Sequence, residues 1–574
     1  MPDLFSPIEI AGRVIPNRIV MPAMTTRLAQ NDGDMTDELI EWYRARAAGG
    51  AGLITVEMSS PSVSGRHRLG EVGVYDRRFL PGLKRLVDAI HGEGRLISIQ
   101  LGHAGSRAAS AVTGVTPLAP TEVSSTVVEG LTHSVMPKSL TKAQILQLRE
   151  DFSNSALMVR DAGFDFVELH GAHGYLISQF LSPYENRRQD EYGGSLENRA
   201  RFGLELLHEL KSACPDLPVI FRLGVEDFFD GGIHIDEAIQ VSRWVAEGGA
   251  SALSVSAGHH RSLPSAEMMI PPMIYPDGIF LDLAAKVKTA VDIPVIAVGR
   301  LNNSKLARSA IEDGRADLIA LGRQLIADPD WPNRVRDGLP VRRCLACNYC
   351  AHKMVTGETI SCVVNGRAGR ETQMSLAPKH RGKNIAIIGA GPAGLAYASL
   401  VGAANRVTVF ERSAKTGGSF RFAGKAPYFG EVIANHESFA RHIAEMEARC
   451  RIADVEFKFN SKVDAKALKG FDQIVVATGA RLPLGLTPVI FRLLDFGIGG
   501  TALAKWIFKK KCFRDWLYYK GRKSTAQQSE LEHPCETIII GDAIRPGLAR
   551  EAIASAFAAA LAQKVESGPS YAEL

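Results

Sequence analysis

Eight short apolar runs recur through the first 320 residues, separated by amphipathic stretches such as Ala143–Asp161. Such alternation predicts parallel strands joined by helices. Eight strands favour a closed (β/α)8 TIM barrel, and periodicity alone leaves an open doubly wound sheet as the alternative. The predicted strands are Arg18–Ala23, Gly52–Glu57, Arg95–Gln100, Phe164–His170, Leu217–Gly224, Ala250–Gly258, Ile293–Gly299 and Ala316–Arg323.

Four of the eight cysteines follow this pattern within nineteen positions: Cys344, Cys347, Cys350 and Cys362. Three thiolates at every third position can converge from a tight loop, and the fourth closes the cage. This spacing favours a [4Fe-4S] cluster. A structural zinc site is the alternative, although zinc ribbons usually have two separated C-x-x-C knuckles. The segment 341–375 is therefore predicted to transfer electrons.

A nucleotide-binding pattern starts at Asn384, where NIAIIGAGPAGLAYASL reads as a strand, a glycine turn and a helix. Gly389, Gly391 and Gly394 would let a pyrophosphate approach the helix N-terminus. Glu411 ends the next strand, where it can accept the ribose hydroxyls. We expect a barrel over residues 1–340 and a dinucleotide-binding domain over 383–574, with APKHRGKN as the linker.

Length and charge exclude several other classes of protein. A chain of 574 residues is too long for a single core. Its formal net charge is only +5, and scattered lysines and arginines argue against a nucleic-acid surface. The sequence has neither a long uncharged apolar stretch nor a basic N-terminal region followed by an apolar run. We therefore expect a cytoplasmic protein without membrane partners. A homo-oligomer is a separate expectation.

Three hydrogen-bonding side chains, His170, His173 and Tyr175, follow the fourth predicted strand. The C-terminal ends of barrel strands form the active-site mouth, so HxxHxY at this place predicts a catalytic cluster. A lone histidine there would more often be a capped or core residue. We expect the two histidines to donate hydrogen bonds to a substrate oxygen and Tyr175 to act as general acid.

Several long motifs resemble the Old Yellow Enzyme family. They are NRIVMPAMTT from Asn17, QLGHAG from Gln100, HGAHGYLISQFLSPYENRR from His170, DEYGGSLENRARF from Asp190 and ALGRQLIADPDW from Ala320. With the cysteine run and the flavin-type domain, they resemble the large branch typified by 2,4-dienoyl-CoA reductase and trimethylamine dehydrogenase. The resemblance covers residues 1–480 and resumes near Thr537.

This resemblance implies FMN at the barrel mouth, with Thr25 near the reactive edge of the flavin. Gly299, Arg300, Gly322 and Arg323 would hold its phosphate. The other matching positions are Pro22, Ala23, Met24, Gln100 and Arg222. We expect Arg222 and Arg323, embedded in apolar strand ends, to be buried rather than paired at the surface. His260 matches a family active-site histidine, with local spacing that differs by one residue.

In the second domain the resemblance implies FAD, with ADP alone as the alternative. Its further matching positions are Ala393, Arg412, Gly418 and Asp542. Reductases of the large branch insert an NAD(P)H-binding domain between the ATG and GD motifs. Only about sixty residues separate Ala480 from Gly541 here, without regular strand alternation. We expect that domain to be reduced or missing, replaced by a short helical insertion at about 484–533.

These features predict an ene-reductase that acts on an α,β-unsaturated carbonyl compound or thioester, with NAD(P)H as a possible donor. Electrons would be relayed through the cluster and FAD. A small-amine dehydrogenase serving an electron-transfer protein is the alternative, although the chain has no cysteine before Cys214 for the cysteinyl flavin link of trimethylamine dehydrogenase. A non-enzymatic redox module is a third class. The basic aromatic stretch Lys505–Lys523 would dock a protein or, as we favour, pack its aromatic side chains on the sheet.

Overall fold

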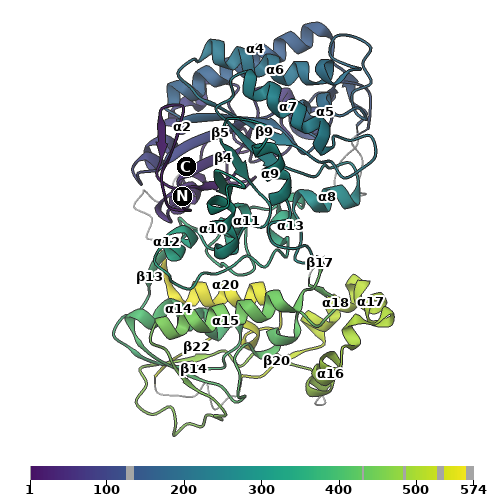
Figure 1. Ribbon diagram of the computed structural model, residues 1–574. Coiled ribbons are helices and arrows are strands. Elements are labelled where there is room, and N and C mark those ends of the chain that lie inside the picture. Colours follow the sequence, from purple (N-terminus) through teal and green to yellow (C-terminus); the bar gives the residue numbers. More distant parts are fainter. Residues whose placement is uncertain (1, 125–134, 430–431, 483–485, 527–534, 564–574) are drawn as a thin grey trace, which may run out of the picture.

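The computed structural model describes residues 2–124, 135–429, 432–482, 486–526 and 535–563. Figure 1 shows two lobes, one above the other. The upper lobe is formed by the first part of the chain, coloured purple to teal, and the lower lobe by the second part, coloured green to yellow. The first lobe holds the predicted barrel strands, and the second holds the glycine turn. Helices α14 and α20 of the second lobe face the first lobe.

The eight predicted strands close into one parallel barrel, in the order β3-β4-β5-β8-β9-β10-β11-β12 and back to β3. An open doubly wound sheet is therefore wrong for this lobe. Most strand side chains are buried on both faces, which is typical of a sheet covered by helices. The strands are β3 Ile19–Met21, β4 Leu53–Ser59, β5 Leu96–Leu101, β8 Phe166–Gly171, β9 Val219–Gly224, β10 Ala252–Ser256, β11 Val295–Ala297 and β12 Leu318–Ala320.

Helices cover the outside of the barrel. The longest, α4 Lys142–Ala162, begins at a capping box made by Thr141 and Gln144 and ends at left-handed Gly163. It matches the amphipathic stretch expected at Ala143–Asp161. The other helices of this lobe include α1 Asp37–Ala48, α2 Leu80–His91, α5 Leu176–Leu181, α6 Leu196–Ala213, α7 Ile235–Glu247, α8 Leu263–Met269, α9 Leu281–Lys288, α10 Ser304–Glu312, α11 Gly322–Ala327 and α12 Trp331–Arg336.

An N-terminal hairpin closes one end of the barrel. Strands β1 Ile8–Ile10 and β2 Arg13–Ile15 pair antiparallel. Ile10 and Ile15 pack with Val20, Leu53 and Phe166, which lie at the starts of barrel strands. The N-terminal end is therefore an apolar plug, and ligands have access to the opposite end.

The second lobe is a Rossmann-like sheet of five parallel strands, ordered β18-β15-β14-β19-β22. Its strands are β14 Asn384–Ile388, β15 Arg406–Phe410, β18 Glu456–Lys458, β19 Gln473–Val476 and β22 Glu536–Ile539. Its helices are α14 Pro392–Val401, α15 His436–Ile452 and α20 Ala549–Ala560. The first strand and helix follow the predicted pattern.

The connection between the lobes is more ordered than a linker. After helix α13 Tyr349–Val355, strand β13 Met374–Pro378 pairs antiparallel with β23 Leu561–Gln563. The start of the expected linker APKHRGKN therefore belongs to a strand. This pairing ties the connection to the far end of the second lobe.

Helices occupy the place of the expected insertion. They are α16 Leu486–Asp495, α17 Ala502–Lys509 and α18 Lys511–Asp515, followed by a π-helical turn at Trp516–Lys520. Strands β20 Ala480–Arg481 and β21 Lys523–Ser524 pair antiparallel at its base. The glycine-containing segment FGIGGTALA is thus a 3-10 turn and the start of α17, rather than a nucleotide loop. Among the described helices, none is both long and apolar enough to cross a membrane.

Candidate active site

The four predicted catalytic side chains lie together at the open end of the barrel. His170 lies near the end of β8, and Tyr175 immediately precedes α5. The ring centroid of Tyr175 is 5.0 Å from that of His170 and 5.8 Å from that of His260, and His170 is 5.3 Å from His173. The fold therefore brings His260, 85 residues away in the sequence, into one cluster with the HxxHxY motif.

Burial fixes the protonation states in this cluster. It lowers the pKa of His170, His173 and His260 well below the usual value, with Arg222 adding to the effect on the first two and Arg107 to that on His260. Burial also raises the pKa of Tyr175, against the opposing charges of Arg68 and Arg107. At neutral pH the cluster thus offers neutral imidazoles and a protonated phenol.

Two nitrogens of the cluster are enclosed without a hydrogen-bond partner among the described residues: Nδ1 of His170 and Nε2 of His260. Buried polar atoms are normally paired, so these two are places for a ligand. The Nε2 of His173 already lies 2.7 Å from the Ser256 hydroxyl. Neighbouring His259 has another role, because its Nε2 lies 2.9 Å from Glu185.

Two further side chains line this cluster, and no motif marked them in the sequence. The His67 ring lies 5.5 Å from Tyr175, and its Nδ1 is 2.6 Å from Glu71. Arg107 follows β5 and acts electrostatically on both Tyr175 and His260. His67 is in a loop and Arg107 ends a 3-10 turn, so only the three-dimensional structure reveals their place.

The predicted flavin-ring residues lie next to the histidines. Arg222 stands directly beside His170 in the β8–β9 register, and its Nε is enclosed without a partner in the described part of the chain. Gln100 donates to Glu168 at 2.6 Å on the neighbouring strands. Arg222 is buried, as expected, and forms no ion pair with the residues that the structure describes. An orphaned guanidinium atom among strand-end polar groups fits the polar edge of a flavin.

The loop after β3 holds Pro22, Ala23, Met24 and Thr25 in sequence. Its next amide, that of Thr26, donates to buried Glu57 at 2.5 Å. Burial raises the pKa of Glu57 to about 8. This carboxyl group, which the sequence did not single out, therefore anchors the predicted flavin loop from β4.

The predicted phosphate cradle is tightly packed at its glycines, which leave no room for a side chain. A Cβ on Gly322 would lie 2.9 Å from the Met24 sulfur, and one on Gly299 (φ +114°) would lie 2.7 Å from the Phe280 ring. Arg300 donates to the Pro272 carbonyl and pairs with Asp277 at 3.1 Å. Arg323 donates to the Pro271 carbonyl at 2.9 Å and to Asn348. The cradle therefore lies against the cysteine segment, because Asn348 belongs to it.

The four thiols lie between the two lobes. Cys350 and Cys362 pack on the barrel core, and Cys344, Cys347 and Cys362 pack on the second core. Burial raises the pKa of Cys350 to about 11 and of Cys362 to about 12, with Cys344 adding to both shifts. All four are free of disulfides. Within the described residues, no three donors are close enough to hold a single metal ion.

The glycine turn of the second lobe has the expected shape. Gly389 is left-handed (φ +109°), and Gly394 packs against its carbonyl. A Cβ on Gly391 would meet no atom within 4 Å, so the turn has open space where a pyrophosphate would lie. Left-handed Gly418 lies beside Gly391. Ala393 is buried in the first turn of α14.

The acidic residues of this lobe already have protein partners. The Glu411 carboxylate accepts from the Ala390 amide and from Ser413, each at 2.9 Å. Asp542 pairs with Arg522 of the insertion at 2.9 Å, although burial raises its pKa to about 6. Arg412 is exposed. The insertion therefore contacts the GD motif directly, which the sequence did not predict.

The insertion presents apolar side chains to solvent. Phe496 is 77% exposed, Leu503 66% and Trp506 59%. The expectation that this stretch packs its aromatic side chains on the sheet is wrong for Trp506 and for half-exposed Trp516. Residues 501–524 also carry eight lysines and arginines and one aspartate. Figure 1 shows helices α16–α18 at the edge of the second lobe.

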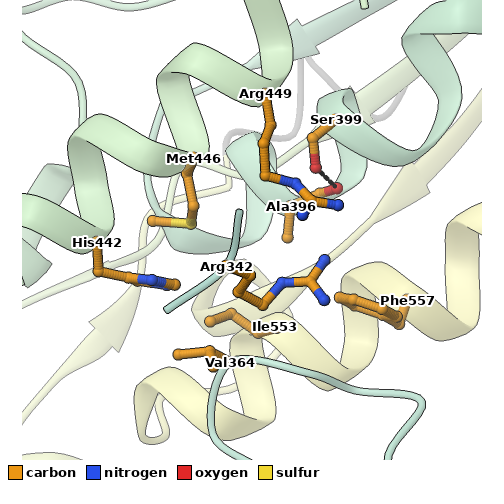
Figure 2. Close-up of a pocket in the computed structure, with 9 residues that line it drawn as sticks. All are labelled: Arg342, Val364, Ala396, Ser399, His442, Met446, Arg449, Ile553 and Phe557. Carbon is orange, nitrogen blue, oxygen red and sulfur yellow. Dashed lines mark hydrogen bonds between the residues drawn. The ribbon is translucent and has the colours of Figure 1, made fainter. Parts of the chain in front are cut away.

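A cavity of about 10 Å³ lies where the cysteine segment meets α14, α15 and α20. Figure 2 shows Arg342 reaching into it between His442 and Phe557. Both ring nitrogens of His442 lack a hydrogen-bond partner in the described structure, and burial lowers its pKa to about 3. The space holds about one water molecule, so it is not a substrate pocket.

Two family models match the chain. Residues 3–342 match the NADH:flavin oxidoreductase / NADH oxidase family. Residues 387–437 match an NAD(P)-binding Rossmann-like domain. The first match spans the barrel, and the second includes the whole glycine turn and Glu411.

Known relatives include both reductases and dehydrogenases. The chain is 35% identical over 494 residues to the NADH oxidase of Thermoanaerobacter brockii, covering 83% of this chain and 73% of that protein. It is 31% identical over 506 residues to the cinnamate reductase of Clostridium sporogenes, covering 83% and 74%. It is 30% identical over 502 residues to the N,N-dimethylglycine/sarcosine dehydrogenase of Chromohalobacter salexigens, covering 84% and 70%.

A solved structure has the same fold along nearly the whole chain. This is the complex of 2-naphthoyl-CoA reductase with 2-naphthoyl-CoA, which matches with a TM-score of 0.87 at 24% identity. The match covers 97% of this chain and 99% of that one.

Proposed function

The chain belongs to the NADH:flavin oxidoreductase / NADH oxidase family, the Old Yellow Enzyme family of its motifs, and on that premise we propose that it is an ene-reductase. Its substrate is an α,β-unsaturated carbonyl compound or enoyl thioester, reduced at FMN in the barrel. The observation that carries this proposal is the cluster of Tyr175 with His170, His173 and His260. Two enclosed nitrogens of this cluster have no hydrogen-bond partner among the described residues, so a substrate oxygen could bind them.

Three groups of the cluster, His170, His173 and Tyr175, have a defined task. Neutral His170 and His173 donate hydrogen bonds to the substrate oxygen, where negative charge develops. Arg222 and Gln100 would hold FMN, which would supply the hydride for the β-carbon. Tyr175 keeps its proton at neutral pH because burial raises its pKa, so it can protonate the α-carbon. Burial of the cluster excludes water from the reacting carbons.

Isotope placement tests this division of tasks. NADH and NADPH deuterated at both C4 positions are each incubated anaerobically with the holoenzyme and 2-cyclohexenone. We expect cyclohexanone with deuterium at the former β-carbon. With unlabelled nucleotide in D2O, we expect deuterium at the α-carbon, because that proton comes from Tyr175 in exchange with solvent. Absence of product with both nucleotides, or interchanged labels, contradicts the proposal.

For the cysteines we propose a [4Fe-4S] cluster, held by Cys344, Cys347, Cys350 and Cys362. Their place between the two cores supports a role in relaying electrons between flavins. For the second lobe we propose FAD, or ADP alone, with its pyrophosphate over Gly391. The open space at this glycine supports a bound dinucleotide.

Oxidation of a small amine is the second candidate function. One observation favours it: the exposed aromatic and basic insertion would suit a protein that accepts electrons near Asp542. In that case electrons enter at FMN and leave through the second lobe. Flavin reduction by a small amine, with no reduction by either nicotinamide nucleotide, would establish this function instead.

A further inference from the structure

Helix α16 of the insertion has apolar side chains on both of its faces. Phe491 stacks on Phe422 of the second lobe, with ring centroids 3.9 Å apart, so the inner face is covered. On the outer face, Leu486, Val489 and Leu493 recur every three or four residues and are exposed. A surface helix normally directs its apolar stripe inward and polar side chains outward, so a second apolar stripe is unusual for a helix in water.

Helix α17 repeats this arrangement. On its inner side, Phe508 packs against Phe513 of α18, with ring centroids 5.3 Å apart. Leu503 and Trp506, one turn apart, are exposed on the other side. Figure 1 shows α17 at the outer edge of the lower lobe. The insertion therefore has an apolar surface beyond the one that its own packing uses.

The exposed cations around α17 are lysines: Lys505, Lys509, Lys510, Lys511, Lys520 and Lys523. The Lys510 Nζ lies 4.0 Å from the centre of the Trp506 ring. The two arginines of this stretch bind the protein itself, because Arg514 donates to the Phe508 carbonyl and Arg522 pairs with Asp542. Only one residue between 501 and 524 is acidic, so this surface is strongly positive.

The kind of charge identifies the partner. Exposed apolar side chains rimmed by polar ones mark a binding surface for a protein or a membrane. Protein–protein interfaces are enriched in arginine and depleted in lysine, which is the reverse of the composition here. A second copy of this chain would bring like charges together. Anionic lipid headgroups attract each lysine near them, and tryptophan and leucine side chains enter the headgroup region of a bilayer.

We propose that α17 docks on the surface of a bilayer that contains anionic phospholipid. Leu503 and Trp506 enter the headgroup region, and the six lysines contact the lipid phosphates. Docking of this kind is peripheral, since an eight-residue helix cannot span a bilayer. The expectation of no membrane partner rests on the small net charge of the whole chain, and the proposal departs from it because lysines are concentrated in this one segment. The inference is independent of the reaction at the barrel.

Sedimentation with vesicles tests the docking surface. The holoenzyme is centrifuged with vesicles of phosphatidylcholine alone or of equal parts phosphatidylcholine and phosphatidylglycerol. We expect the partition coefficient to be at least about 100-fold larger for the anionic vesicles. Reversing three charges, in Lys509→Glu/Lys510→Glu/Lys511→Glu, should lower it about 100-fold or more. Leu503→Ser/Trp506→Ser should lower it about tenfold or more, because less apolar surface leaves water.

Two matched variants make the same changes elsewhere in the second half of the chain. Leu376→Ser removes a more exposed leucine from β13, and Lys462→Glu/Lys466→Glu/Lys469→Glu reverses three other exposed lysines. Both should bind anionic vesicles within about threefold of the wild type. The thermal midpoint of each variant shows that it is folded.

Three results overturn the inference. One is equal weakening by the two lysine variants, which would make the attraction a property of the whole molecule. Another is equal binding of the wild type to both kinds of vesicle. The third is no sedimentation of the wild type with anionic vesicles, which would leave an acidic protein as the partner of this surface.

Discussion

The barrel mouth and the helical insertion differ in what they expose to solvent: the mouth encloses polar side chains, and the insertion exposes apolar ones. At the mouth, His170 is 4% exposed and its polar atoms are enclosed. In the insertion, Trp506 is 59% exposed and lysines surround it. Under the proposed function the chemistry belongs to the barrel, and the second lobe keeps a nucleotide turn without a sheet for nicotinamide in its described residues.

The largest effect of a substitution is expected at the four cysteine thiols, which lie between the barrel and the second lobe. Cys347→Ser should abolish cluster binding, because a four-thiolate cage cannot close with three ligands. Iron and acid-labile sulfide should fall from about four of each per chain to nearly none. Exposed Cys512→Ser, in the insertion, is the control and should retain both. If the wild-type protein contains zinc in place of iron, the proposed [4Fe-4S] cluster is wrong.

Inside the barrel, Tyr175→Phe should slow reoxidation of the reduced flavin by an enone about 10²- to 10⁴-fold, because the α-carbon loses its acid. Reduction by nicotinamide nucleotide should change little, since it needs no proton from Tyr175. Stopped-flow measurement of the two half-reactions separates these outcomes. Equal slowing of both would mean that the residue only maintains the site. His170→Ala should weaken carbonyl ligands and still retain FMN.

The flavin loop should make stability depend on pH through Glu57. Its pKa is about 8 in the folded protein and about 4.5 in the unfolded chain, so the folded state binds more protons between these values. Stability from this group is therefore complete below about pH 4.5 and is lost as pH rises through 8. Between pH 6 and 9, the free energy of unfolding should fall by roughly 2–3 kcal/mol less in Glu57→Gln than in the wild type. Parallel pH profiles of the denaturation midpoint for both proteins would contradict the burial of this carboxyl group.

In the second lobe, Gly391→Val should weaken dinucleotide binding at least about tenfold, because its side chain fills the space over the turn. No protein atom lies within 4 Å of the added Cβ, so the nucleotide-free protein should keep its stability. Nucleotide released on denaturation is measured by chromatography. Gly500→Ala, at an equally open glycine of the insertion, serves as control. Full nucleotide content in Gly391→Val would place the dinucleotide elsewhere.

The smallest effect is expected in the insertion itself. Trp506→Ser should change the free energy of unfolding by less than about 0.5 kcal/mol, because its side chain is already in water. Trp42→Ser, in the fully buried barrel core, should cost about 3–5 kcal/mol. Chemical denaturation measures both. A large loss for Trp506→Ser would show that another surface covers this face in solution.

Most of the fold could be predicted from the sequence. Each barrel strand is a continuous apolar run, and the glycine turn carries its own strand and helix, so local patterns specify both lobes. The HxxHxY cluster was predictable because its residues are neighbours at a strand end. His67, Glu57, Arg107 and Arg522 were not, since each acquires its role from a contact with a distant segment. Trp506 was misjudged because an aromatic helix looks the same in sequence whether its apolar face is covered or exposed.

Anaerobic stopped-flow absorbance tests the central claim most directly. NADH or NADPH alone should bleach the flavin of the holoenzyme, and 2-cyclohexenone should then restore it. Such a cycle requires the nucleotide to reduce the enzyme and the enone to reoxidise it. No bleaching by either nucleotide, together with bleaching by trimethylamine, would contradict the account and make the chain an amine dehydrogenase.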